Sequence, residues 1–298
     1  MTEKSCKVIN IVTPGKYILN GLWFGGNSPK RAIIFIHGLT SNVFANHDLV
    51  IPLADKNTAV ITFNNRGHDM IAKIHKVDKR KKKGYTSEYI GETHEVFTDC
   101  VDDIQGVVNF VRKSGVKEIY LVGQSTGSHK SVYYITRRGK RKFIKGVVLL
   151  SPMSDYASAL KFDKKGQLKK ATDVARKMVE EGREHNLIPL DIWEQMDDAQ
   201  RFLSLYTPES EEEIFTYAQP VKIPSTLRKI KIPILVILAE KDEYRDRSMK
   251  QIAEWFKKNV KARNKKIVIL ENAAHNFKGN EKDVLYEIGA WLRTITLM

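Results

Sequence analysis

The sequence predicts an α/β fold, in which a mostly parallel central sheet is flanked by helices and carries a helical insertion. Short runs of β-branched and aromatic residues, typical of strands buried on both faces, alternate with segments of helical periodicity. Between about residues 157 and 231 the alternation stops and only helical periodicity occurs. We therefore expect a core domain formed by residues 1–156 and 232–298, and a helical cap or lid formed by residues 157–231.

The N-terminal third is expected to supply an antiparallel pair and the first buried strands. Pro14 and Gly15 separate two strand-like runs, Val8–Val12 and Tyr17–Phe24. Two continuous apolar runs, Ala32–Ile36 and Ala59–Phe63, are expected to be buried strands. A short helix is expected between them, at residues 44–56. A long basic loop is then expected to reach about Gly91.

The remaining core elements alternate regularly. A helix is expected at residues 92–113, where apolar residues recur at helical spacing. The elements predicted after it are the strand Glu118–Gly123, the helix Thr126–Arg138, the strand Gly146–Ser151, the strand Pro233–Ala239, the helix Ser248–Asn259, the strand Lys266–Leu270 and the helix Glu281–Ile295.

Charge and cysteine content bound the class of protein. The formal net charge is +15, and lysine and arginine gather in Lys73–Lys83, Lys130–Lys145 and Lys257–Lys266. No motif of a nucleic-acid-binding fold accompanies them, so we interpret these clusters as solvated surface and expect no specific nucleic-acid partner. Two distant cysteines, a polar start and apolar runs well below the ~18 residues of a membrane span indicate a cytoplasmic protein without such a span.

The sequence Gly-Gln-Ser-Thr-Gly at residues 123–127 is the first candidate for chemistry. The pattern is short, but here a predicted strand runs directly into it and a predicted helix begins directly after it. Such a tight turn strains the central residue, and glycines on either side leave room for the neighbouring strand and helix. Ser125 is therefore predicted to be a nucleophile held clear of the sheet.

A serine hydroxyl needs a base, and the base needs an orienting acid. Asp242 follows the strand that ends at Ala239, and His275 follows the next strand. Loops after parallel strands gather at one edge of a sheet, so we expect these two side chains to meet Ser125 there. Asp155 is the main rival for the acid, with Glu240 and Glu243 as further alternatives, and the other histidines weighed are interpreted as structural or surface residues: His37, His68, His75, His94 and His185.

An oxyanion that develops during acyl transfer needs two backbone N–H donors. One is expected from Thr126, the residue after the nucleophile, and the other from Leu39 in the turn His37-Gly38-Leu39 after an early strand.

With these residues in place, the chain resembles the α/β-hydrolase family along essentially its whole length. The resemblance lies in the His-Gly turn, Asn65-Arg66-Gly67-His68, the serine elbow, the acid and the late histidine. The elbow has Gln124 where the commoner form of the motif has histidine. Three short stretches are similar to a group that includes fungal siderophore esterases: Gly123–Ser128, Leu150–Asp155 and Ala239–Tyr244.

The resemblance implies a serine esterase that forms an acyl-enzyme and needs no cofactor or metal. We expect a small-molecule ester with an apolar portion as its substrate, bound by the aromatic residues of the insertion: Trp193, Phe202, Tyr206 and Phe215. The same triad would serve a thioesterase, an amidase or a peptidase. A non-catalytic protein that binds partners through its basic surface is the alternative from another class, and the basic loop 73–83 could also reach the active-site face.

Overall fold

A single twisted sheet forms the centre of the molecule. The computed structural model describes residues 5–137, 143–163 and 165–296. Their strands follow the order β10-β9-β8-β7-β3-β4-β2-β5-β6, with β1 paired to β2. Pairing is parallel from β10 to β4 and antiparallel among β4, β2, β1, β5 and β6. The strands are β1 (Cys6–Val12), β2 (Tyr17–Phe24), β3 (Arg31–Ile36), β4 (Thr58–Phe63), β5 (Ala72–Val77), β6 (Tyr85–Ile90), β7 (Glu118–Gln124), β8 (Ile144–Leu150), β9 (Ile234–Ala239) and β10 (Lys265–Leu270).

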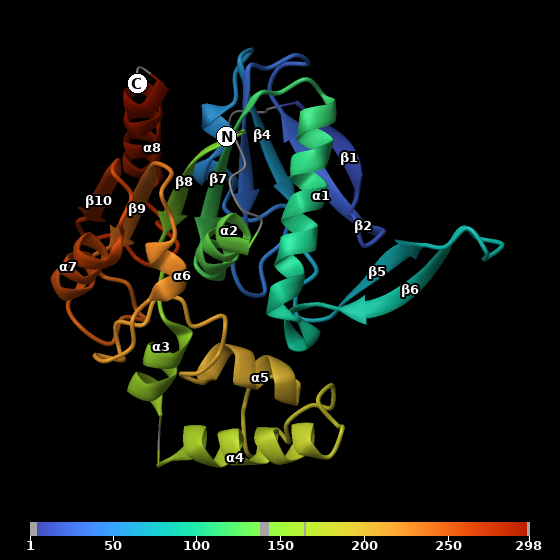
Figure 1. Cartoon of the computed structure of the whole chain (residues 1–298), viewed down its shortest axis with the longest axis vertical. Coiled ribbons are helices and arrows are strands. Elements are labelled where there is room, and N and C mark those ends of the chain that lie inside the picture. Colours follow the sequence, from blue (N-terminus) through green and yellow to red (C-terminus); the bar gives the residue numbers. More distant parts are fainter. Residues whose placement is uncertain (1–4, 138–142, 164, 297–298) are drawn as a thin grey trace.

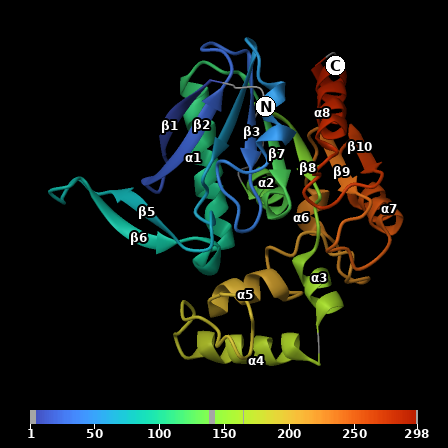
Figure 2. The same ribbon diagram turned by 180° about the vertical axis from the view of Figure 1, so that it is seen from behind.

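Helices cover both faces of this sheet, which confirms the predicted α/β architecture. One face packs against α1 (Cys100–Lys113), α2 (Thr126–Arg137) and α7 (Met249–Asn259). The other face packs against α8 (Glu281–Thr296) and the loops around Val50. Figures 1 and 2 show the sheet from opposite sides, with α1 and α2 in front of the strands in Figure 1. The parallel strands β3, β4 and β9 are mostly apolar and almost wholly buried, because both of their faces are covered, whereas the edge strand β10 is partly exposed.

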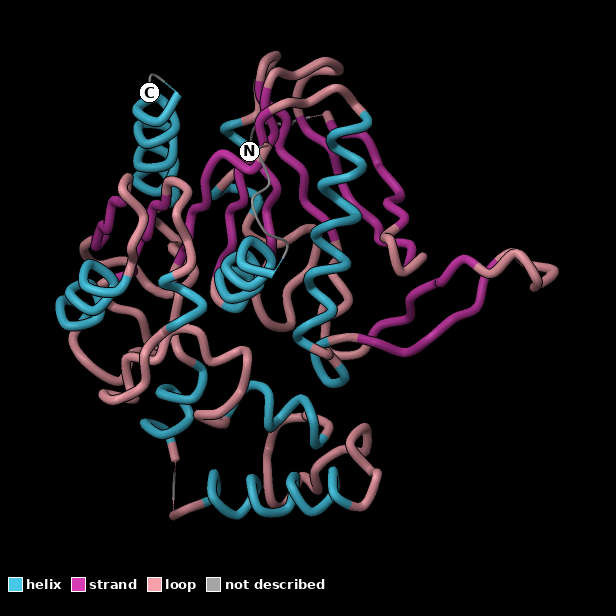
Figure 3. Tube along the Cα trace, in the orientation of Figure 1, coloured by secondary structure: helices cyan, strands magenta, loops and turns pink. Residues whose placement is uncertain are grey.

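The insertion forms a helical layer beyond one end of the sheet. This layer consists of α3 (Asp155–Phe162), α4 (Gln167–Glu180) and α5 (Ala199–Tyr206), and the short α6 (Ser225–Arg228) follows it in the chain. Figure 3 shows α3, α4 and α5 below the strands, joined by loops. Residues between Leu168 and Tyr206 share a small apolar core of their own. By contrast, apolar residues between 214 and 230 pack into the main core beside α2 and α7, so the last quarter of the predicted insertion packs with the sheet.

Three local predictions differ from the structure. Residues 44–56 form two 3₁₀ turns, His47–Leu49 and Ile51–Leu53, because Pro52 and the β-branched residues around it disfavour a regular helix. The expected basic loop is largely the hairpin β5–β6, which projects from the edge of the sheet (Figure 1). The helix expected from residue 92 begins as an α-helix only at Cys100, after two 3₁₀ turns. Arg138, the predicted last residue of the next helix, lies outside the described residues.

A cluster of buried charges joins the helical layer to the sheet domain. Arg201 of α5 and Lys130 of α2 have fully buried side chains. Glu95 lies between them, 2.5 Å from Lys130 Nζ and 3.0 Å from Arg201 Nη2. Arg201 also donates to Glu212 at 2.6 Å, and Lys130 donates to the side-chain oxygen of Asn65 at 3.3 Å. The interpretation of Lys130 as solvated surface is therefore wrong, since its ammonium is needed to neutralise a buried carboxylate.

Two buried histidines remain neutral in the folded protein. Burial, followed by repulsion from Lys130, lowers the pKa of His37 to about 3. Its Nδ1 lies 2.9 Å from the carbonyl oxygen of Gly38, and its Nε2 accepts the N–H of Asn65 at 3.3 Å. That pattern suits the tautomer with the proton on Nδ1. Burial also lowers the pKa of His129 to about 3, and its ring packs 4.5 Å from that of Phe215.

No helix in the described part of the chain is both long and apolar enough to cross a membrane.

Replacing Arg201 should strongly destabilise the protein. We expect Arg201→Met to lower the free energy of unfolding by about 3–5 kcal/mol, because it leaves buried carboxylates without their counter-charge. Chemical denaturation followed by circular dichroism measures the change. The control is Arg176→Met, which removes a half-exposed pair with Glu209 and should cost less than about 1 kcal/mol. Equal losses in the two variants would contradict the prediction.

Removing His129 should reduce the acid sensitivity of folding. In the unfolded chain this ring takes up a proton near pH 6.5, whereas in the folded protein it stays neutral down to about pH 3. Stability from this group is therefore present above pH 6.5 and falls as the pH falls. We expect the loss of unfolding free energy between pH 7 and pH 5 to be about 2 kcal/mol smaller in His129→Leu than in the wild type.

Urea titrations of both proteins at the two pH values test this expectation. Phe256→Leu is the control, because it disturbs packing against Phe215 without removing a titratable group. The unfolding free energy of Phe256→Leu should depend on pH as that of the wild type does. If both variants show the same reduced dependence, altered packing and not the loss of the His129 ring explains the change.

Candidate active site

Ser125 lies at a sharp turn between β7 and α2. Its φ is 53°, in the left-handed region that a non-glycine residue adopts only under constraint. The Ser125 N–H donates to the Leu150 carbonyl at 2.9 Å, which fixes the turn against β8. A Cβ on Gly123 would lie 2.2 Å from the Gly127 carbonyl oxygen, and one on Gly127 would lie 2.1 Å from that of Ile36. Only glycine fits at either position, as the motif predicts.

Asp242 and His275 form a hydrogen-bonded pair after β9 and β10. His275 Nδ1 is 2.7 Å from Asp242 Oδ2, and the Asp242 side chain is fully buried. The other Asp242 oxygen, Oδ1, accepts the N–H of Tyr244 at 3.0 Å. With the proton on Nδ1 donated to this carboxylate, Nε2 of His275 is left as a base. The pair has the chemistry of a general base with its orienting acid.

The histidine loop is tied to the turns beside it. Ser151 Oγ donates to the His275 carbonyl at 2.9 Å, and Ser151 directly follows Leu150, the residue that holds the Ser125 backbone. Glu243 accepts the His275 N–H at 3.1 Å. The loops after β7, β8, β9 and β10 are therefore joined at their backbones, as expected where the carboxyl ends of parallel strands meet.

The turn after β3 brings Leu39 to the same place. A Cβ on Gly38 would lie 2.9 Å from Ser125 Cβ, so glycine is needed for this close approach. Neutral His37 fixes the turn through its two hydrogen bonds. Thr126 is the first residue of α2, and its N–H therefore has no acceptor within the helix. Both expected oxyanion donors, Leu39 and Thr126, thus stand in turns that adjoin Ser125.

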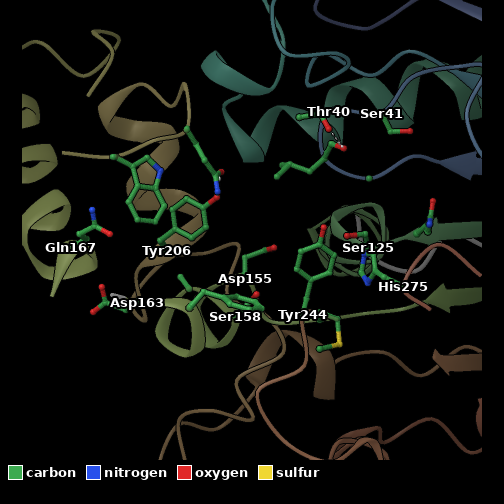
Figure 4. A pocket seen from close by; sticks show the side chains of 18 of the residues that line it. Thr40, Ser41, Ser125, Asp155, Ser158, Asp163, Gln167, Tyr206, Tyr244 and His275 are labelled. Carbon is green, nitrogen blue, oxygen red and sulfur yellow. Dashed lines mark hydrogen bonds between the residues drawn. The ribbon is translucent and has the colours of Figure 1, made fainter. Parts of the chain in front are cut away.

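These turns surround one pocket of about 420 Å³. Figure 4 shows Ser125 and His275 on one side of it and Tyr206 and Gln167 on the other. The residues that line it come from both the sheet edge and the helical layer, and are Gly38, Leu39, Thr40, Ser41, Asn46, Gln124, Ser125, Met153, Asp155, Ser158, Ala159, Phe162, Asp163, Gln167, Trp193, Gln195, Tyr206, Tyr244 and His275. Asp242 is absent from this wall because it lies behind His275, where it is buried.

Two of the four aromatic residues expected to bind substrate do not reach the pocket. Trp193 and Tyr206 line it, whereas Phe202 and Phe215 are fully buried. Phe202 lies behind Trp193 and Tyr206, with ring centroids 5.0 and 5.3 Å away, and so supports them from the core of the helical layer. Phe215 packs between His129 and Phe256 in the main core. Rings without a polar atom gain most from such dry positions.

Asp155, the rival candidate for the acid, lies in the pocket wall rather than against the His275 ring. Burial raises the pKa of its carboxyl to about 7, and repulsion from Glu212 adds to this. Its position at the start of α3, directly after the N-cap Ser154, is a sequence signal that places it near the end of β8. Tyr244 and Gln195 also line the pocket, and no sequence pattern singled them out.

The arrangement of Ser125, His275 and Asp242 suits acyl transfer. Within the described residues, no group of three or more His, Cys, Asp or Glu side chains could hold a metal ion.

Comparison with solved structures identifies the fold. The esterase Pf2001 of Pyrococcus furiosus aligns over 99% of this chain and 92% of its own, with a TM-score of 0.61 and 17% identity. The siderophore hydrolase EstB of Aspergillus fumigatus aligns over 99% of both chains, with a TM-score of 0.69 and 15% identity. Est1E of Butyrivibrio proteoclasticus, solved with ferulic acid bound, covers 97% of this chain and 100% of its own, at a TM-score of 0.58 and 16% identity. The chain has the α/β-hydrolase fold.

No curated protein matches the chain in sequence. A family model does match residues 78–293, from the tip of the β5–β6 hairpin into α8, and therefore includes Ser125, Asp242 and His275. The chain is a member of this family, which is described as a protein of unknown function, DUF1749.

Proposed function

We propose that this protein is a serine hydrolase that cleaves carboxylic esters through an acyl-enzyme. The observation that carries the proposal is the 2.7 Å bond between Asp242 and His275 at a pocket that Ser125 also lines. The structural likeness to Pf2001, EstB and Est1E supports the same chemistry.

In the proposed reaction, His275 Nε2 takes the Ser125 proton as Oγ attacks the ester carbonyl. The N–H groups of Leu39 and Thr126 stabilise the oxyanion, and Asp242 stabilises the imidazolium. His275 then donates its proton to the alcohol that leaves. Water attacks the acyl-enzyme with His275 again as the base, which releases the acid and restores Ser125.

The helical layer acts as a cap in this proposal. Asp155, Trp193 and Tyr206 come from it and line the pocket that Ser125 also lines, so the cap determines which esters fit. The likeness to EstB agrees with the similarity to fungal siderophore esterases that the sequence suggests. We further propose a reducing, cytoplasmic setting, because Cys6 and Cys100 are both free thiols.

Replacing Ser125 should abolish turnover. We expect Ser125→Ala to lower kcat for 4-nitrophenyl acetate by at least about 10³-fold and to end labelling by a fluorophosphonate probe, since the nucleophile is lost. The matched control is Ser114→Ala, which removes an exposed hydroxyl at the end of α1 and should be labelled like the wild type. Absence of labelling and of ester turnover in the wild type would refute the proposed function.

Asp242→Asn tests the role of the acid. The amide keeps the shape of the side chain but can stabilise the wrong His275 tautomer, so we expect a loss of about 10²–10⁴-fold in kcat. Asp155→Asn, which leaves the Asp242–His275 bond in place, should lose far less on the same neutral ester. A larger loss in Asp155→Asn would assign the orienting acid to Asp155. Parallel assays with thioester and anilide substrates of the same acyl group distinguish an esterase from a thioesterase or amidase.

A further inference from the structure

The pocket carries acidic groups although the protein as a whole is strongly basic. The net charge is +15, yet among the described residues that line the pocket none is lysine or arginine. Two carboxyl groups, those of Asp155 and Asp163, face it. Lys161 lies between two lining residues in sequence, but its Nζ donates to the Glu243 carbonyl at 2.9 Å. The described lining of the pocket therefore offers no lysine or arginine to pair with an anionic substrate, and it suits a neutral or cationic one.

Asp155 is the carboxylate best placed to meet a cation. Within the described chain it has no ion pair or hydrogen bond through its carboxyl oxygens. The guanidinium of Arg201, which attracts it, already contacts Glu212 at 2.6 Å and Glu95 at 3.0 Å. Burial and repulsion from Glu212 and Glu213 oppose its ionisation, and the pKa of Asp155 is about 7. A positive ligand would supply the counter-charge that the surrounding residues do not provide.

Asp155 lies close to the aromatic part of the pocket. Burial first, and then the charges around it, raise the pKa of Tyr206 well above its usual value, and Asp155 is one of these charges. Tyr244 lies on the other side of the Asp155 carboxyl (Figure 4). Burial, and then the charges of Glu243, Asp242 and Asp155, raise its pKa as well. The carboxyl of Asp155 is thus flanked by rings from α5 and from the loop after β9 (Figure 4).

The Trp193 and Tyr206 rings are fixed by their polar ends. Trp193 Nε1 donates to Asp197 at 2.9 Å, and the Tyr206 hydroxyl donates to Gln195 at 2.8 Å. Their centroids are 5.1 Å apart, and buried Phe202 supports both. With the polar atoms engaged, the groups left for a ligand are π faces, which attract alkylammonium ions.

We infer that the pocket selects esters whose non-reacting part carries an alkylammonium group, bound by the carboxylate of Asp155 and the rings of Trp193 and Tyr206. This rests on the proposed ester hydrolysis and names its substrate class. Asp163 and Phe162 contribute less, because Asp163 is exposed and accepts the Leu168 N–H at 3.0 Å, and Phe162 already has Lys161 Nζ 4.5 Å from its ring centroid.

A pair of isosteric esters tests the inference. Choline butyrate and 3,3-dimethylbutyl butyrate differ by the replacement of N⁺ by carbon, so the ratio of their kcat/KM values isolates the charge. At pH 8, where Asp155 is mostly ionised, we expect the wild type to favour the cationic ester by roughly tenfold or more. Asp155→Asn should bring the ratio close to one. Asp173→Asn removes an exposed carboxylate on α4 and should keep the wild-type ratio.

A binding measurement separates failure of this inference from failure of the proposed function. Calorimetric titration with phenyltrimethylammonium needs no turnover, and Ser125→Ala should bind it as the wild type does. Asp155→Asn should bind it roughly tenfold more weakly. Binding that depends on Asp155 in a protein that hydrolyses no ester would refute only the proposed function. Hydrolysis with a ratio near one in the wild type, or a ratio or affinity that Asp155→Asn leaves unchanged, would overturn the inference.

Discussion

The carboxylate of Glu95 is the interaction on which the arrangement of the two layers depends. It contacts Lys130 of α2, the helix that begins directly after Ser125, and Arg201 of α5, in the helical layer. Both cations are fully buried, so neither can exchange its partner for water. Lys130 extends the connection to Asn65, which in turn donates its backbone N–H to His37 in the turn that carries Leu39. The orientation of α5 and that of the proposed oxyanion turn are thus set by one connected group of polar contacts.

The network also explains the neutrality of His37. Burial is the largest cause of its lowered pKa, and the network adds to it, because a protonated ring would repel Lys130 and would lose the acceptor that receives the Asn65 N–H. The neutral tautomer satisfies both ring nitrogens and keeps Gly38 against Ser125. The strained backbone of Ser125 is thereby held from several directions, by β8 through Leu150 and by the turn through Gly38. A left-handed residue persists only where its surroundings constrain it in this way.

Much of the core could be predicted because it follows local rules. Buried parallel strands are continuous apolar runs, and the chain positions of Ser125, Asp242 and His275 follow from the strands that precede them. The 3₁₀ turns at residues 47–53 were missed, because apolar spacing alone does not distinguish them from a helix. The β5–β6 hairpin was missed because its two strands have only one buried residue between them and are joined by a basic turn, and a solvated strand lacks an apolar pattern. Buried Lys130 and the aromatic residues that miss the pocket depend on tertiary contacts, which periodicity does not encode.

The burial of Arg201 has a consequence for how molecules enter and leave the pocket. A hinged movement of α5 away from the sheet would separate the Arg201 guanidinium from Glu95, so that the buried guanidinium would lose one of its carboxylates and Glu95 would keep only Lys130 of its two close cations. Such a movement is far more costly than rotation of a side chain at the mouth, where Tyr244 is 46% exposed. We therefore expect rotation of side chains such as Tyr244, on the picosecond-to-nanosecond scale, rather than a hinged movement of α5, to admit ligands to the pocket.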